Sequence, residues 1–296
     1  MTSTTALGRQ DKTRQDILST IAMTDPNFPP NLDIKPLLLT HDHPHGQVQS
    51  DNQTNAIAAY GIAGRIWEAT KPLLDYFTPS QAYEPPCSLF ASRGPHCVVE
   101  LGSGQSVASL HLAAHLAPQN TIVLTDLPAV IPLCEKCIDS WRPPKCHAKV
   151  VARPLAWGQT ATHLREEFGP ISHVLMCDLI YFPHLYPLLL YTLLSLTEPS
   201  SVADMEDDTF GPEVIISYTT RTLALEESFF DALAHYFKTT PVRGGTWEAK
   251  VFIGKRWKVT KDWSLPDIKD VMNGSKEVIR GRSYGLIDEL FGTLDW

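Results

Sequence analysis

From about residue 56 onward, short apolar runs alternate with segments in which apolar side chains recur every three or four positions. A short apolar or β-branched run predicts a buried strand, and the longer repeat predicts an amphipathic helix. The predicted strands are 96–101, 121–125, 148–154, 171–177 and 213–218. The predicted helices are 56–78, 107–116, 127–141, 162–168, 186–196 and 226–237. Strands alternating with helices build a parallel sheet that is covered on both faces.

The pattern changes beyond residue 240. Two further runs, 247–252 and 257–259, lie on either side of Gly254-Lys255, and we expect them to form a hairpin. The sequence therefore predicts an α/β fold with seven strands, mostly parallel, that ends in an antiparallel C-terminal hairpin. We expect this domain to span residues 56–260, followed by an extension, 261–296, that packs on it or trails from it.

Residues 1–55 are polar and rich in proline, so we expect a poorly structured arm. Within it, His41, His43 and His45 are metal-ligand types, although such a cluster beside Asp and Pro is usually solvated. The first twenty residues lack the apolar core of a secretory signal, which favours the cytosol or the nucleus.

The composition narrows the function. Of 296 residues, 43% are hydrophobic and 20% charged, which indicates a folded chain. The 33 acidic residues outnumber the 25 basic ones, and a net charge of −8 argues against a nucleic-acid binder. Apolar runs fall short of the roughly 20 residues of a membrane span, so we expect no membrane partner. We expect the protein to be a monomer.

Six cysteines in a chain without an export signal are expected to be reduced. Cys134-x-x-Cys137 with Cys146-His147 has ligand types suited to zinc. Because Cys134 and Cys137 share a helical face with apolar neighbours, buried thiols are the favoured interpretation and no metal site is expected.

Candidate chemistry gathers where the predicted strands end. The first strand runs into Glu100-Leu101-Gly102-Ser103-Gly104, a turn whose glycines let a ligand approach the backbone closely. No third glycine follows, so binding of a pyrophosphate is poorly supported. A turn of this kind preceded by an acid suits a ligand without phosphates that carries a cationic amino-acid end.

The ends of the next strands add further polar and aromatic side chains. Asp126-Leu127 follows the second strand, where an acid holds ribose hydroxyls, and Asp126 also occupies a possible helix N-cap position. Trp157-Gly158 follows the third strand, at the level where an adenine would lie. Asp178 and Tyr181 follow the fourth, and Trp67 is expected on the helix before the first strand. Core packing or turn capping explains each of these residues equally well when it is taken alone.

Together these motifs resemble the seven-β-strand S-adenosylmethionine-dependent methyltransferases, and within them the family-sixteen protein-lysine methyltransferases. The resemblance covers about residues 60–255. It rests on six motifs in the family's order: Gly64-x-x-Trp67, Glu100-Leu101-Gly102-Ser103-Gly104, Thr125-Asp126, Leu155-x-Trp157-Gly158, Asp178-x-x-Tyr181, and Tyr218-x-x-Arg221 followed by Glu227-x-Phe229-Phe230.

The resemblance implies a Rossmann-like fold, S-adenosylmethionine as the cofactor and a lysine of a protein as the substrate, with elongation factors or chaperones as the substrate class. It implies that Asp178 and Tyr181 face the incoming lysine, where they orient the amine or receive its proton through water. It also implies a cofactor-binding set that comprises Trp67, Glu100, Gly102, Ser103, Gly104, Asp126, Leu127, Trp157 and Asp178.

Two other interpretations stay open. One is a methyltransferase of the same fold that acts on a small-molecule amine. The other is a non-catalytic S-adenosylmethionine-binding interaction protein. Ser106 and Ser109 motivate the second, because they stand where the family usually has glycine, and a serine at positive φ costs about 1 kcal/mol.

Overall fold

The computed structural model describes residues 28–29, 33–37, 46–79, 82–91, 94–199, 208–245 and 249–281. The chain divides into two compact units, Met1–Arg65 and Ile66–Trp296. Among the described residues, none of the helices combines the length and the apolar character that crossing a membrane requires. The histidines at 41, 43 and 45 lie outside the described residues.

The first unit contains helix α2 (Gly46–Tyr60) and the 3₁₀ turn η1 (Gly61–Gly64). The side chain of Gln53 pairs with the backbone of Leu37: it accepts the Leu37 N–H at 3.1 Å and donates to the Leu37 carbonyl at 2.9 Å. A Cβ at Gly64 would lie 2.2 Å from the Ala56 carbonyl, so only glycine fits there. The helix thus begins inside the segment expected to be a poorly structured arm, and that expectation was wrong for residues 46–55.

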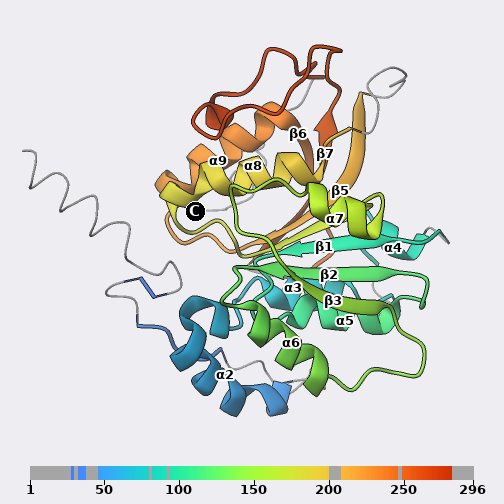
Figure 1. Ribbon diagram of the computed structural model, residues 1–296, viewed down its shortest axis with the longest axis vertical. Helices are drawn as coiled ribbons and strands as arrows, with labels where there is room; N and C mark the ends of the chain where they lie inside the picture. Colours follow the sequence, from blue (N-terminus) through green and yellow to red (C-terminus); the bar gives the residue numbers. More distant parts are fainter. Residues whose placement is uncertain are drawn as a thin grey trace, which may run out of the picture. The chain divides into compact units, whose positions relative to one another are not determined.

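The second unit contains one seven-stranded sheet in the order β3-β2-β1-β4-β5-β7-β6 (Figure 1). Strands β1 to β5 are parallel, whereas β7 is antiparallel to both β5 and β6. The strands are β1 (Cys97–Leu101), β2 (Thr121–Asp126), β3 (Lys149–Pro154), β4 (His173–Cys177), β5 (Thr209–Tyr218), β6 (Phe237–Pro241) and β7 (Lys250–Trp257). The predicted fold class is confirmed.

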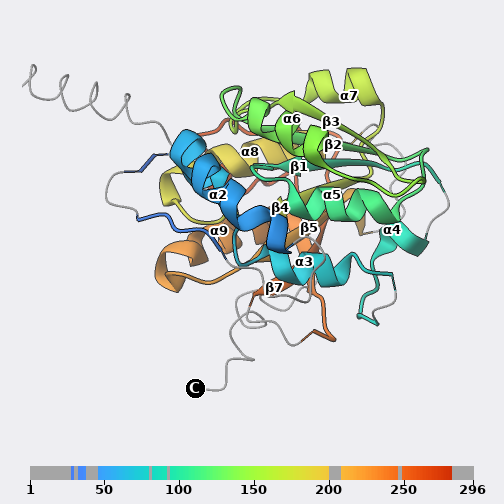
Figure 2. The same ribbon diagram turned by 90° about the horizontal axis from the view of Figure 1, so that it is seen from below.

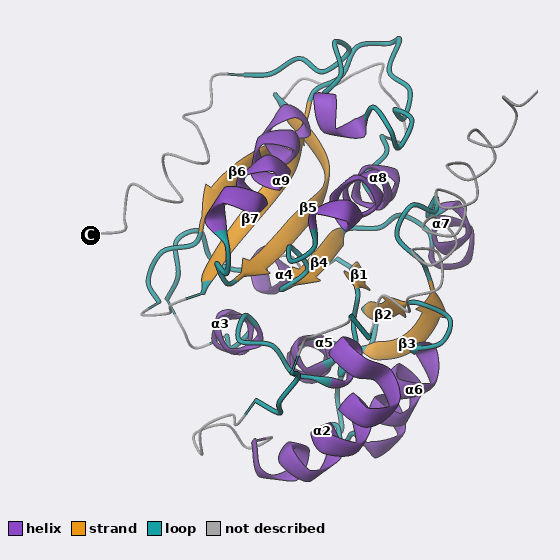
Figure 3. Ribbon diagram, turned by 90° about the vertical axis from the view of Figure 1, so that its left-hand side faces the viewer, coloured by secondary structure: helices purple, strands orange, loops and turns teal. Residues whose placement is uncertain are grey.

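Helices cover both faces of this sheet (Figure 3). One face packs against α7 (Thr162–Phe168), α8 (Tyr186–Leu196) and α9 (Leu223–Tyr236). The other face carries α3 (Thr70–Tyr76), α4 (Ser88–Ala91), α5 (Val107–His115) and α6 (Ile131–Ser140), which Figure 2 shows from below. Short 3₁₀ turns are η2 (Pro183–Leu185) and η3 (Val271–Asn273).

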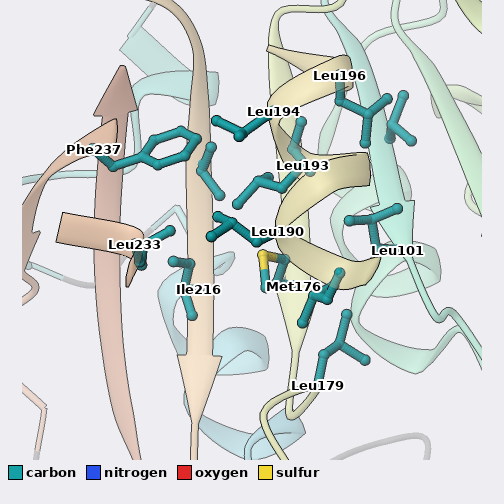
Figure 4. Packing of buried hydrophobic residues seen from close by; sticks show 14 of the residues in the cluster. Leu101, Met176, Leu179, Leu190, Leu193, Leu194, Leu196, Ile216, Leu233 and Phe237 are labelled. Atoms are coloured by element: carbon teal, nitrogen blue, oxygen red, sulfur yellow. The ribbon is translucent and has the colours of Figure 1, made fainter. Parts of the chain in front are cut away.

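Side chains alternate between the two cores along each strand. In β4, Val174 and Met176 enter the core under α8 and α9, whereas Leu175 enters the core on the opposite face. The leucines of α8 lie over Met176 and Ile216 in Figure 4. Because strands buried on both faces carry continuous apolar runs, the sequence pattern found them well.

The antiparallel edge differs from the expectation. No turn forms at Gly254-Lys255; β7 runs straight through both residues, between β5 and β6. Its hairpin partner is β6, which follows α9 directly. Beyond β7, Val259 bridges Val278, and Val271 is fully buried under Tyr236, whose hydroxyl donates to the Val271 carbonyl at 2.9 Å. Residues 260–281 therefore pack on this unit. The division of the chain at residues 55 and 260 stays a prediction.

The single helix expected over 56–78 is also interrupted. A non-helical segment separates η1 from α3 and contains Ile66 and Trp67. The sequence pattern had placed Trp67 on a helix, and that prediction was wrong.

Candidate functional site

The parallel strands end at one edge of the sheet, where β1 lies between β2 and β4 and the strand order reverses. Ligands of such sheets bind outside the carboxyl ends of the strands at this reversal. The glycine turn leaves β1 here, with Gly102 at φ 57° and Gly104 at φ 45°, values that favour glycine. The turn therefore exposes its backbone at the position where a ligand is expected.

Hydrogen bonds fix this turn to the end of β2. The carbonyl of Glu100 accepts the Thr125 hydroxyl at 2.6 Å and the Ser103 hydroxyl at 3.3 Å. The Thr125 N–H donates to Ser103 Oγ at 3.0 Å, and the Ser103 N–H donates to the Thr125 carbonyl at 2.9 Å. Ser103 thus shapes the turn from within, and its side chain is buried.

Asp126 ends β2 and spans from that strand to the turn. Its Oδ2 accepts the Gly104 N–H at 2.9 Å, and its Oδ1 accepts the N–H of the half-buried Leu127 at 2.7 Å. Burial raises the Asp126 pKa to about 6, against the lowering effect of these two N–H groups. Asp126 is not a helix N-cap, as one interpretation had it, because α6 begins only at Ile131 and Val130 takes the cap position.

Glu100 is a second buried carboxylate, only 2% exposed. Burial raises its pKa to about 8, while the Ser109 and Ser103 hydroxyls lower it and the Asp126 charge raises it further. Among the described residues, its Oε2 has no hydrogen-bond partner although it is buried. A buried acceptor without a donor fits a ligand that brings a cationic N–H group, such as the amino-acid end of S-adenosylmethionine.

Trp157 and Leu179 close in on the turn from the ends of β3 and β4. A Cβ at Gly102 would lie 2.8 Å from Leu179 Cδ2 and 3.4 Å from the Trp157 ring. Gly102 is therefore required by space as well as by its φ. The Trp157 ring is half-buried, and Gly158 anchors it by donating to Thr192 Oγ1 at 2.8 Å. Leu179 carries no sequence signal that distinguishes it from a core leucine.

Ser106 occupies the left-handed region, at φ 56° and ψ 21°, immediately before α5. Its N–H donates to the Ser103 carbonyl at 2.6 Å, and its carbonyl accepts the Leu110 N–H at 3.0 Å. The expected positive φ is therefore present with a serine in place. The turn keeps its shape, and the strain of the serine is compensated by these two bonds and the start of α5.

Asp178 follows β4 with its side chain fully buried and its φ at 60°. Arg221 donates to both carboxylate oxygens, from Nη1 to Oδ1 at 2.9 Å and from Nη2 to Oδ2 at 2.5 Å. The Thr219 N–H adds a 3.4 Å contact to Oδ1. Burial raises the Asp178 pKa, whereas Arg221 lowers it. Asp178 is therefore one half of a charge pair and not a free carboxylate.

Trp67 and Tyr181 lie at the same edge. The Arg221 guanidinium is 5.1 Å from the centroid of the Trp67 ring, and Glu68 Oε2 lies 3.9 Å from Arg221 Nη2. The Tyr181 ring lies 6.1 Å from the Trp157 ring, between centroids. Burial raises the pKa of the Tyr181 phenol, and the charges of Asp126 and Asp178 raise it further.

Glu226 is a residue of this edge that the sequence pattern did not single out. It is buried and accepts the Tyr218 hydroxyl. Its Oε1 also accepts the backbone N–H groups of Arg221 at 3.1 Å and Thr222 at 3.0 Å, which ties the loop after β5 to α9. The sequence signal that could have indicated Glu226 is an acid three to five residues into a helix, because such a side chain can reach back to the backbone N–H groups at the helix start.

The cysteines show no metal-binding arrangement among the described residues. Cys134 is buried with its thiol 3.6 Å from the Gly104 carbonyl, and Cys137 lies 3.6 Å from Gln105 Oε1. Burial raises the pKa of both thiols, to about 11 for Cys137. Cys146 is exposed. The two helical cysteines pack behind the glycine turn.

Comparison with known proteins supplies the family. Residues 49–236 match the profile of a family described as lysine methyltransferase. The chain is 32% identical over 139 residues to EEF1A lysine methyltransferase 3 of Mus musculus, a match that covers 47% of this chain and 53% of the mouse protein. It is 26% identical over 193 residues to protein-lysine N-methyltransferase EFM6 of Saccharomyces cerevisiae, a match that covers 60% of this chain and 71% of the yeast protein.

The match thus spans about half the length of the mouse relative. Among solved structures, an O-methyltransferase family protein from Burkholderia thailandensis is similar at 13% identity and a TM-score of 0.45, covering 85% of this chain and 70% of the other. That likeness is too distant to add to the assignment. The profile match covers more than half of the chain and includes every residue of the edge described above, from Trp67 to Glu226, and the chain therefore belongs to the lysine methyltransferase family.

Proposed function

We propose that this protein transfers the methyl group of S-adenosylmethionine to the side-chain amine of a lysine in a protein substrate. The observation that carries the proposal is the pair of buried carboxylates, Glu100 and Asp126, at the glycine turn of a chain in the lysine methyltransferase family. The mouse relative is named for EEF1A, so EEF1A is the first candidate substrate. We further propose that the protein acts as a monomer in the cytoplasm.

The cofactor would lie along the ends of β1, β2 and β3. Glu100 would accept the amino group of its methionine end through the unpartnered Oε2. Asp126 would accept the ribose hydroxyls, and the Trp157 ring would lie against the adenine. Gly102 and Gly104 would let the ligand reach the backbone, while Ser103 and Leu127 shape the turn and the end of β2. Trp67 and Asp178 would complete this set at the methionine end.

The bound cofactor supplies an activated methyl group on a sulfonium. The chain must then hold the lysine as a neutral amine, because the ammonium form has no lone pair. The ordinary pKa of a lysine side chain is near 10.4, so the ammonium form prevails in water at neutral pH. Trp67, Tyr181 and Asp178 form the transfer edge, where apolar rings remove water from the amine and so lower its pKa. Alignment of the amine with the methyl group is the main contribution of such a site.

Asp178 and Tyr181 are the two side chains at the transfer edge that could accept the proton of the lysine amine. Asp178 is bound by Arg221 through both oxygens, and the raised pKa of Tyr181 keeps its hydroxyl protonated at neutral pH. Neither side chain is therefore suited to act as a base. We propose that the lysine loses its proton to water before it reaches the edge, and that Tyr181 and Asp178 orient the amine instead of deprotonating it.

The test is incubation with S-adenosylmethionine that carries a labelled methyl group, in a cell lysate and with purified EEF1A. The expected result is a labelled protein band whose label is recovered as methyl-lysine after hydrolysis. A lysate whose lysines have been acetylated serves as the matched negative control. Label in a soluble metabolite would support the small-molecule alternative. No label in either fraction, despite measurable binding of S-adenosylhomocysteine, would support the non-catalytic alternative.

A further inference from the structure

We propose that Arg221 is a positioning residue for methyl transfer: it cancels the charge of Asp178 and holds Trp67, so that the transfer edge accepts a neutral amine. This inference rests on the proposed function and assigns a role to a residue outside the site set expected from the sequence. It follows from the contacts of the guanidinium, from the way the Arg221 backbone is held, and from the charges around it.

The guanidinium connects three segments that are far apart in the sequence. It binds Asp178, after β4, with two hydrogen bonds at 2.9 and 2.5 Å. It lies 5.1 Å from the Trp67 ring centroid and 3.9 Å from Glu68, both in the segment that leads into α3. A planar guanidinium can pair with a carboxylate in its plane and stack on a ring with its face, which a lysine ammonium cannot do.

The backbone of Arg221 is held as firmly as its side chain. Buried Glu226 accepts the Arg221 N–H at 3.1 Å and the Thr222 N–H at 3.0 Å, and it also accepts the Tyr218 hydroxyl. The loop between β5 and α9 therefore has a fixed conformation on both sides of Arg221. A side chain fixed at both ends can position a neighbour, here the Trp67 ring, with little loss of entropy on ligand binding.

The two side chains of the charge pair differ in their exposure to solvent. The Asp178 side chain is fully buried, whereas 30% of the Arg221 side chain is exposed. An unpaired carboxylate beside the transfer edge would stabilise a lysine ammonium and raise its pKa, the opposite of what transfer needs. Paired with Arg221, Asp178 exerts little net field on the amine, while its oxygens stay fixed.

Other charged and titratable groups face this pair, and their contributions are retained in every variant. Glu68 lies before α3 and Glu226 on α9, and both act on Arg221. The Asp178 charge also acts on Tyr181 and on the Cys177 thiol; Asp126 acts on Tyr181 as well, and Glu100 acts on Cys177. Since none of them is changed by a substitution at 178 or 221, differences between variants report the pair itself.

The experiment measures the initial rate of labelled-methyl incorporation into lysate protein between pH 6.5 and 10, in wild type, Arg221→Gln, Asp178→Asn and the double variant. Arg221→Gln leaves a lone carboxylate, so the midpoint of the rate should move to higher pH, by roughly half a unit to one unit. Asp178→Asn leaves a lone guanidinium, so the midpoint should move to lower pH. The double variant should return it close to that of wild type, at a lower maximal rate.

Further measurements keep the outcomes distinct. Binding of S-adenosylhomocysteine, measured by calorimetry, should change less than threefold in Arg221→Gln. The matched control is Arg153→Gln, which breaks the exposed bidentate pair with Glu167 and should leave the rate and its pH midpoint unchanged. Arg221→Lys keeps the charge and should lower the rate without moving the midpoint; it replaces Arg221→Gln if that variant does not fold. Midpoints that stay in place or move in the same direction for Arg221→Gln and Asp178→Asn would overturn the inference. Wild type without any labelled protein would instead contradict the proposed function.

Discussion

The N–H of Gly104 donates to Oδ2 of Asp126 at 2.9 Å, which joins the glycine turn after β1 to the end of β2. Two motifs that lie 22 residues apart in the sequence thereby form one surface. The same carboxylate accepts the Leu127 N–H, so its orientation is fixed before any ligand arrives. Such an oriented acceptor is what recognition of a ribose needs, because less side-chain entropy is lost when the ligand binds.

Asp126→Asn is the first test of this surface. The amide keeps one oxygen acceptor and the shape of the side chain, but it loses the charge, so S-adenosylhomocysteine should bind about tenfold or more weakly. The affinity is measured by isothermal titration calorimetry. Because the Asp126 pKa is near 6, wild-type affinity should also fall as the pH drops from 7 to 5, and this fall should be smaller in Asp126→Asn. Equal affinities at pH 7 would remove Asp126 from the cofactor site.

Glu100→Gln tests whether the second carboxylate is held at a cost to stability. The folded-state pKa of about 8 lies above the ordinary value of 4.5, so the folded chain binds more protons than the unfolded chain between these pH values. The free energy of unfolding must therefore decrease as the pH rises through this window. Removing the charge should stabilise the ligand-free protein at pH 8.5, by an amount of order a few kcal/mol, and less at pH 6.

Urea unfolding at the two pH values checks this prediction. Asp126, whose pKa is also raised, contributes a slope of the same sign between about pH 4 and 6, which lies below the range compared here. The variant should at the same time lose affinity for S-adenosylhomocysteine, since Glu100 is the partner that we propose for the ligand's amino group. A variant that is equally stabilised at both pH values would mean that the Glu100 charge does not carry the effect.

Ser106→Gly tests the strain in the turn. Ser106 adopts φ 56°, where glycine is free of the Cβ penalty, so the variant should be more stable by up to about 1 kcal/mol. Affinity for S-adenosylhomocysteine should stay the same or improve. Ser106→Ala is the matched control, because it keeps the Cβ and loses only the hydroxyl, which lies 3.4 Å from the Gly104 carbonyl. Thermal unfolding measures the stability, and a loss of affinity in both variants would assign the hydroxyl a ligand contact.

The parts of the fold that the sequence predicted well are those with a local cause. Helices α7 and α8 have the predicted bounds, because their apolar repeat and their flanking residues agree. Strand β6 was missed because Phe237 follows α9 without a turn residue between helix and strand. Gly254 suggested a turn, but in β7 it lies in extended backbone against Val214, where its Cβ position is 3.5 Å from that side chain.

The same distinction holds for the site. The acid and glycine positions could be found from the sequence because strand ends of a parallel sheet meet at one edge. The pairing of Asp178 with Arg221 could not, since the two residues are 43 positions apart and either could have faced solvent. For the same reason Glu226 was not distinguished from Glu227: only the packing of α9 decides which of the two is buried.

Tyr181 provides the test of how the proton leaves. Burial and the charges of Asp126 and Asp178 raise the pKa of its phenol, so the hydroxyl stays protonated and cannot take the proton of the lysine. Tyr181→Phe keeps the ring that lies against Trp157 and Phe182 and loses only the hydroxyl, whose proposed hydrogen bond to the amine would be worth roughly 1 kcal/mol. Labelled-methyl transfer in the lysate should therefore fall by no more than about tenfold, and its pH midpoint should stay in place.

Tyr181→Ala removes the ring as well, which admits water to the amine, so its rate should fall much further while S-adenosylhomocysteine still binds. If Tyr181→Phe instead abolished transfer and removed the alkaline rise of the rate, the phenol would be the base, and the orienting role proposed for it would be wrong.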